Sequence, residues 1–127
     1  MDTNLSYEIK KLSPQLLVSD LDSSIIFYTK QLDFEIDFVY EKFYCGISKN
    51  GFSIHLKQAK PNFEERISRR ESEHNDLIFS IQAIESLYED ILKRNVNIIQ
   101  SLRNMPYGKE FYIIDPDGYI LSFIEEK

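Results

Sequence analysis

The most informative segment of the chain runs from residue 108 to residue 125 and reads GKEFYIIDPDGYILSFIE. Its centre, residues 115–118, has the chemistry of a tight turn, because Pro116 presets φ and Gly118 accepts a positive φ. The flanking residues are mostly aromatic or branched, and such side chains favour strands. The segment therefore predicts two strands, residues 110–114 and 119–125, joined by this turn.

The residues before this segment extend the pattern to a larger unit. Ile84, Leu87, Tyr88 and Ile91 recur at helical spacing, and the basic residues that follow favour a helix C-terminus. The predicted elements are a strand at 76–81, a helix from residue 84 to about residue 94, a strand at 97–102, and a loop at 103–108 that holds Pro106 and Gly108. The second half of the chain thus reads strand, helix and three strands.

The first half of the chain shows the same order. Leu21, Ile25, Tyr28 and Leu32 mark a helix at 21–31, and Asn50-Gly51 is a strong hairpin-turn signal. The predicted strands are residues 13–18, 34–40, 43–48 and 52–58. Residues 59–75 are charged and predict an exposed connection that is helical in part.

This repetition predicts an α+β fold made of two βαβββ units, which form a curved mixed sheet around a cleft. One such unit leaves a sheet face that it cannot cover alone, so two units are expected to share the cleft. We expect a single domain over residues 1–127, with units at about 8–58 and 76–126 joined by the charged segment 59–75.

Composition narrows the function classes. The net charge of −6 argues against nucleic acid as a partner, because such binding usually needs a basic face. No apolar run is long enough to span a bilayer, and residues 1–11 lack the apolar stretch of a signal peptide, so we expect a cytoplasmic protein without membrane partners. Cys45 is the single cysteine, which excludes an intramolecular disulfide and a cysteine-rich zinc site.

Three motifs, in this order, resemble the vicinal oxygen chelate superfamily. They read SPQLLVSDL at 13–21, IESLY at 84–88 and GKEFYIIDPDG at 108–118. This superfamily includes glyoxalase I, extradiol dioxygenases, fosfomycin-resistance enzymes and bleomycin-resistance proteins. The resemblance implies a glyoxalase/bleomycin-resistance-like fold over most of residues 13–125.

The resemblance also implies where a metal site would lie. The four ligand positions of the family's enzymes fall at Ser13, His55, Asp76 and Ser122. Serine is a poor ligand, and a metal site normally needs three or more protein ligands. We therefore predict no metal, no other cofactor and no catalytic residue. If the register shifts by two residues, His74 joins His55 and Asp76 in an alternative ligand set.

Strand alternation predicts the side chains that face the cleft. The predicted ligand-binding residues are Ser13, Gln15, Ser53, His55, Lys57, Asp76, Ile78, Phe111, Ile113 and Ser122. This set combines apolar walls with a few polar groups, which is typical of small-molecule pockets.

Three functional hypotheses follow. The first is a non-catalytic protein that binds a cationic or aromatic antibiotic-like ligand, as the resemblance to the metal-free bleomycin-resistance branch implies. The second is a metal-dependent lyase, isomerase or dioxygenase that uses His55, Asp76 and His74. The third is a scaffold whose own side chains fill the cleft. The resemblance also implies a homodimer, which would cover apolar surface left open by the curved sheet.

Overall fold

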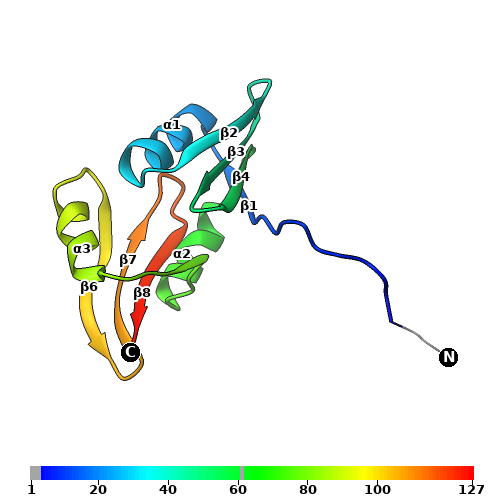
Figure 1. The fold of residues 1–127 in the computed structure, drawn as a ribbon. Helices are drawn as coiled ribbons and strands as arrows, with labels where there is room; N and C mark the ends of the chain where they lie inside the picture. The colour runs from blue at the N-terminus through cyan, green and yellow to red at the C-terminus, as the bar shows by residue number, and fades with distance from the viewer. Residues whose placement is uncertain (1–3, 61) are drawn as a thin grey trace.

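The first unit folds as one four-stranded sheet and a helical segment (Figure 1). Its elements are β1 (Gln15–Val18), α1 (Leu21–Ile26), a π-helical continuation η1 (Phe27–Gln31), β2 (Glu35–Tyr40), β3 (Tyr44–Lys49) and β4 (Phe52–Gln58). The strand order is β1-β4-β3-β2, with β1 parallel to β4 and the other pairs antiparallel. This is a computed structural model that describes residues 4–60 and 62–127.

The second unit repeats this arrangement. Its elements are β5 (Leu77–Ser80), α3 (Ile84–Leu92), β6 (Asn97–Met105), β7 (Gly108–Ile114) and β8 (Ile120–Glu126). The order β5-β8-β7-β6 matches the first sheet, and the outer pair β5 and β8 is again parallel. The predicted α+β fold of two βαβββ units is confirmed, with the eight strands divided between two four-stranded sheets.

One connection differs from the prediction, and another agrees with it. The expected loop at 103–108 is wrong, because β6 continues to Met105, β7 starts at Gly108, and a two-residue turn joins them. The charged segment contains the helix α2 (Phe63–Glu71), whose N-cap Asn62 accepts a 3.1 Å hydrogen bond from the Glu65 amide. That cap satisfies one of the free amides that every helix N-terminus leaves.

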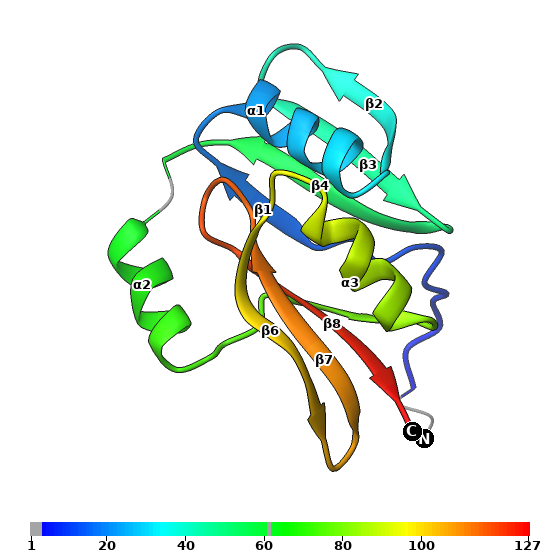
Figure 2. The same ribbon diagram turned by 90° about the vertical axis from the view of Figure 1, so that its left-hand side faces the viewer.

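The core lies between the sheets and the two helices α1 and α3, which form one layer in Figure 2. On β1 and β4 every second side chain is buried in this core: Leu16, Val18, Ile54 and Leu56. The two units share one core, since Phe34 and Phe79 meet edge to face with ring centroids 6.4 Å apart. Each sheet is left with an open face on the side away from its helix. Across the described residues, no helix is long and apolar enough to cross a membrane.

Candidate functional site

The open face of the first sheet brings together several predicted ligand-binding residues. Gln15 pairs with His55, and Leu17 pairs with Lys57, so their side chains form rows across the parallel strands β1 and β4. Gln15 and Lys57 are exposed, whereas His55 is half-buried. At the start of β1, the Ser13 hydroxyl is hydrogen-bonded to the hydroxyl of the buried Ser53. Alternation on β1 and β4 therefore determines which side chains lie on this open face.

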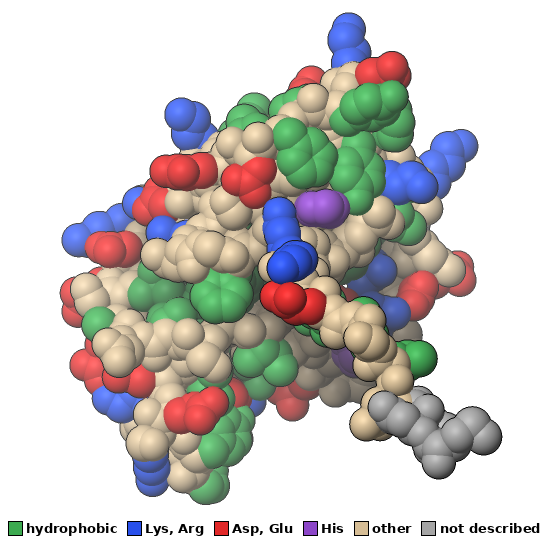
Figure 3. Space-filling view, turned by 45° about the vertical axis from the view of Figure 1, so that its right-hand side comes forward, with side chains coloured by type: hydrophobic (Ala, Val, Ile, Leu, Met, Phe, Trp, Pro, Cys, Tyr) green, Lys and Arg blue, Asp and Glu red, His purple; other side chains and the backbone are tan. Residues whose placement is uncertain are grey.

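Aromatic rings form the central part of this face. We call Phe38, Tyr44 and His55 the aromatic group. The Phe38 and Tyr44 rings are nearly parallel, with centroids 6.2 Å apart and planes at 15°. The His55 ring stands edge-on to both, 5.4 Å from Phe38 and 5.5 Å from Tyr44. Figure 3 shows hydrophobic side chains gathered beside a histidine on this side of the molecule. Phe38 remains 40% exposed, so its ring is accessible to a ligand.

Gly46 makes this arrangement possible. It lies between Phe38 on β2 and His55 on β4 in the register of the sheet. A Cβ atom at this position would lie 2.3 Å from Cε1 of the Phe38 ring. The absence of a side chain therefore lets Phe38 lie flat against the sheet and reach His55.

The polar end of the aromatic group is a short hydrogen-bond chain. Gln15 Nε2 donates to the Tyr44 hydroxyl over 3.0 Å, and that hydroxyl lies 2.8 Å from His55 Nδ1. Which of the two atoms donates in this contact depends on the tautomer of the His55 ring. His55 Nε2 is buried and has no hydrogen-bond partner among the residues described. A buried polar atom without a hydrogen-bond partner is costly, which makes Nε2 the unsatisfied atom of the aromatic group.

The open face of the second sheet carries the predicted residues Ile78 and Ser122, which pair across β5 and β8. Ile78 is 64% exposed, whereas Ser122 is buried and pairs with Tyr112 on its other side. Ser122 lies between these larger neighbours.

The placement of Phe111 and Ile113 in the cleft is wrong. Both are fully buried in the core on the helix side of β7. Phe111 packs edge-on against Tyr88 of α3 and stacks on Phe123, with centroid distances of 5.0 and 5.1 Å. The residues that alternate with them, Glu110 and Tyr112, lie on the open face instead.

Those residues belong to a polar cluster that the sequence analysis missed. Glu110 is 3% exposed and accepts hydrogen bonds from Arg103 Nη2 (2.6 Å), Arg103 Nε (2.9 Å), the Tyr112 hydroxyl (2.9 Å) and the Tyr107 hydroxyl. Burial by itself raises the pKa of Glu110, but these hydrogen bonds outweigh it and hold the pKa below its ordinary value. The available signal was a charged residue on a strand, directly before the apolar run at 111–114. Both carboxylate oxygens of Glu110 already accept hydrogen bonds within the cluster. The cluster therefore forms part of the surface of the second open face and leaves no free carboxylate oxygen there.

Asp76 has a structural role. Its Oδ1 accepts from Arg69 (2.9 Å) and Arg66 (3.2 Å) of α2, and its Oδ2 accepts from the Ile120 amide (2.8 Å). His74 is exposed. Within residues 4–60 and 62–127, no three His, Cys, Asp or Glu side chains lie close enough to hold a metal ion. The chain therefore does not assemble the alternative ligand set His55, His74 and Asp76, because α2 occupies Asp76.

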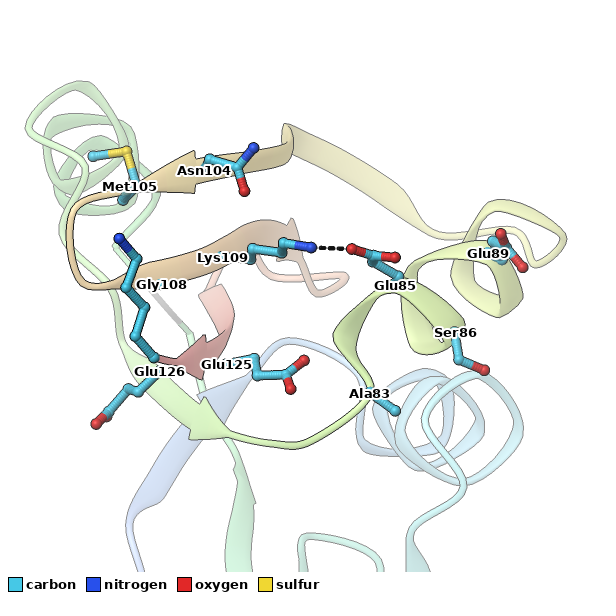
Figure 4. Close-up of a pocket in the computed structure, with 11 residues that line it drawn as sticks. Ala83, Glu85, Ser86, Glu89, Asn104, Met105, Gly108, Lys109, Glu125 and Glu126 are labelled. Atoms are coloured by element: carbon cyan, nitrogen blue, oxygen red, sulfur yellow. Dashed lines mark hydrogen bonds and ion pairs between the residues drawn. The ribbon is translucent and has the colours of Figure 1, made fainter.

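A pocket of about 740 Å³ lies elsewhere, between the start of α3 and the ends of β6, β7 and β8 (Figure 4). Lys109 and Glu85 form an ion pair across it, and Glu125 accepts a 2.9 Å hydrogen bond from the Ile84 amide. Further carboxylates line it, from Glu89 and Glu126. The pocket contains none of the predicted ligand-binding residues and no aromatic ring, so it differs in chemistry from the open faces.

The chain matches one known protein family over most of its length. The family model described as Glyoxalase/Bleomycin resistance protein/Dioxygenase superfamily matches residues 11–123. A comparison with curated protein sequences finds no significant match.

Several solved structures share the fold at low identity. UcmS2 superposes with a TM-score of 0.77 at 19% identity, covering 94% of this chain and 100% of its own. The bleomycin-binding protein from bleomycin-producing Streptomyces verticillus, complexed with copper(II)-bleomycin, has a TM-score of 0.71 at 17% identity, with 96% and 100% covered. TnmS3, an antibiotic binding protein from Streptomyces sp. CB03234, has a TM-score of 0.72 at 15% identity, with 99% and 100% covered.

Proposed function

The chain belongs to the Glyoxalase/Bleomycin resistance protein/Dioxygenase superfamily, and from this premise we propose that it binds a small molecule with a planar aromatic or cationic group, without transforming it. The binding surface is the open face of the first sheet, centred on Phe38, Tyr44 and His55. The observation that carries the proposal is the combination of an exposed ring at Phe38 and an unpartnered polar atom at His55 Nε2.

This face suits such a ligand for two physical reasons. Aromatic rings stack on planar groups and attract cations to their faces, at about 0.5–1.5 kcal/mol for each contact. The net charge of −6 adds a favourable long-range field for a cation. The bleomycin-binding protein and TnmS3 bind antibiotics on the same fold, which supports antibiotics as the first ligand class to test.

Binding is favoured over metal catalysis by the state of the donor atoms. The Ser13 hydroxyl is bonded to Ser53, and both oxygens of Asp76 are occupied by α2 and the Ile120 amide. His55 is the remaining good ligand of the four positions, and one ligand does not hold a catalytic metal. A stoichiometric divalent metal that is lost in His55→Ala would instead support a metal-dependent lyase, isomerase or dioxygenase.

We expect Phe38→Ala to weaken ligand binding about tenfold or more, which corresponds to about 1.4 kcal/mol. A thermal-shift screen with cationic and planar aromatic antibiotics, bleomycin among them, would identify the ligand, because a ligand specific for the folded state raises the midpoint. Titration of Phe38→Ala and His55→Ala would then locate the site.

Val39→Ala is the matched control, since Val39 is exposed on the same strand but points to the opposite face. It should bind as the unmodified protein does. Equal affinity in Phe38→Ala, His55→Ala and Val39→Ala would place the ligand elsewhere, and an absence of any shift across the panel would contradict the ligand class.

We also propose a homodimer. Leu5, Tyr7, Ile9 and Leu12 precede β1 in an extended segment and are each more than 60% exposed, and exposed apolar surface of this extent favours association. Light scattering at micromolar concentration should give twice the 15.0 kDa of the chain. A two-fold contact would use the same patch on both copies. If the measured mass equals that of one chain at every concentration up to the solubility limit, the dimer is contradicted.

A further inference from the structure

One short turn makes several of the polar contacts between the two units. Residues 115–119, which we call the junction turn, connect β7 to β8 and insert against β1 and η1 of the first unit. Asp115 accepts a 2.7 Å hydrogen bond from the Tyr28 hydroxyl, and Asp117 accepts one of 3.0 Å from the Ser19 amide. The Tyr119 hydroxyl lies 2.9 Å from the Leu17 amide and donates to the Leu17 carbonyl over 2.8 Å.

The junction turn is buried, and two of its own side chains, Asp115 and Asp117, carry carboxyl groups. Asp115 is 4% exposed and Asp117 is 2% exposed, and Tyr28 is fully buried above them. Asp115 Oδ1 accepts hydrogen bonds from the Asp117 and Tyr119 amides, each over 2.9 Å, while the one partner of its Oδ2 among the described residues is the Tyr28 hydroxyl. Asp117 Oδ2 is buried without a hydrogen-bond partner among the described residues. A buried carboxylate with an unpaired oxygen is costly when charged.

Few groups around Asp115 and Asp117 can stabilise a negative charge on both carboxylates at once. Tyr28 faces the pair from η1, and Tyr119 lies beside it. The only cation among the described neighbours is Arg66 of α2, whose guanidinium stacks 3.9 Å over the Tyr119 ring and is hydrogen-bonded to Asp76. Arg66 thus contacts the junction turn through Tyr119, and it forms its ion pair with Asp76 rather than with either member of the pair.

We propose that Asp115, with Asp117 beside it, forms a pH-sensitive switch between the two units. Uptake of one proton by Asp115 stabilises the packing of the junction turn against the first unit. The proton goes to Asp115 Oδ2, the oxygen that no backbone amide bonds. Oδ1 keeps both amide hydrogen bonds, and the Tyr28 hydroxyl accepts the new hydrogen bond in place of donating one. The hydrogen bond between Asp115 and Tyr28 is kept with its direction reversed, and the charge repulsion between the two carboxylates disappears.

The direction of the pH dependence follows from linkage. Burial raises the pKa of Asp115 from 3.8 to about 6, against hydrogen bonds from Tyr28 and two amides that lower it, and the nearby Asp117 raises it further. Because the folded state holds the proton more tightly than the unfolded chain, the stabilisation is complete below pH 3.8 and is lost as the pH rises through about 6. Two pKa units correspond to about a hundredfold change in the unfolding equilibrium constant.

The test compares urea unfolding of the unmodified chain and Asp115→Asn between pH 4.5 and 7. Asparagine is neutral at every pH, so its variant lacks the pH dependence that Asp115 contributes. The ratio of the two unfolding constants should therefore change by tens of fold over this range. The unmodified chain should become less stable, relative to the variant, as the pH rises to 7. Asp90→Asn, the same change at an exposed position of α3, should keep a constant ratio to the unmodified chain. A constant ratio for Asp115→Asn would overturn the switch.

Two further variants should move the midpoint in opposite directions. Tyr28→Phe removes a hydrogen bond that favours the charged form and should shift the midpoint to higher pH, whereas Asp117→Asn removes the repelling charge and should shift it to lower pH. Carboxyl carbon NMR of the unmodified chain gives a readout that does not depend on any variant folding. A titration midpoint for Asp115 near 6 is expected, and a midpoint at or below 4 would overturn the proposal. The switch holds whatever ligand the open face binds.

Discussion

Replacing Phe111 with alanine is expected to lower the free energy of unfolding by about 3–5 kcal/mol, the range for large-to-small changes of buried aromatic residues. Phe111 is fully buried and packs between Tyr88 and Phe123, so its removal leaves a cavity in the shared core. Urea unfolding monitored by circular dichroism would measure the change. The result decides between a core position and the ligand-facing position that strand alternation alone suggested.

Ile78→Ala provides the matched control for this experiment. Ile78 lies on the open face of the second sheet and is 64% exposed, so its truncation should alter stability by less than about 0.5 kcal/mol. A small stability loss in Phe111→Ala, accompanied by weaker ligand binding, would instead return Phe111 to the ligand surface.

Replacing Gly108 with alanine is expected to cost about 3–5 kcal/mol, from overpacking together with backbone strain. Gly108 has a φ of 150°, and a Cβ there would lie 2.2 Å from the Glu125 carbonyl oxygen and 2.9 Å from the Glu126 Cα. These are backbone atoms of the neighbouring strand β8, so no side-chain rotation relieves the overlap. The strands β7 and β8 would have to separate at this end of the second sheet.

Gly51→Ala separates the two contributions. Gly51 has a φ of 84° in the turn between β3 and β4, but a Cβ there would meet no atom within 4 Å. Its replacement should therefore cost only the strain of the left-handed conformation, about 1–2 kcal/mol. Equal losses in Gly108→Ala and Gly51→Ala, measured by thermal or urea unfolding, would show that the contact with β8 is not the cause.

The two open faces differ in what a ligand would meet. On the first sheet, Phe38 presents an exposed ring, and the adjacent His55 holds a buried nitrogen, Nε2, without a hydrogen-bond partner among the described residues. On the second sheet, Glu110 is saturated by Arg103 and two tyrosine hydroxyls. A buried charge is stable only when it is fully hydrogen-bonded, and Glu110 already meets this condition within the cluster. The cluster therefore lines the face without offering a ligand an unsatisfied group. The proposed ligand site therefore centres on the first sheet.

Local sequence was sufficient for the order of the elements and for one face of the site. Turns such as Asn50-Gly51 depend on the φ preferences of their own residues, and helices on a period of 3.6, so both can be recognised without the fold. On β4, apolar Ile54 and Leu56 alternate with Ser53, His55 and Lys57, and one face of the strand is buried against α1. A clean alternation of this kind indicates the direction of every side chain.

Only the tertiary structure decided which β7 side chains face the core and which residues form the aromatic group. The run FYII at 111–114 is apolar at every position, because α3 covers one face of β7 and the polar cluster of Arg103, Glu110 and Tyr112 fills the other. Periodicity cannot orient a strand that is buried on both faces. Phe38 meets Tyr44 and His55 through strand register, with an irregularity between Ile36 and Phe38, and pairing between strands is a property of the folded sheet that no local pattern contains.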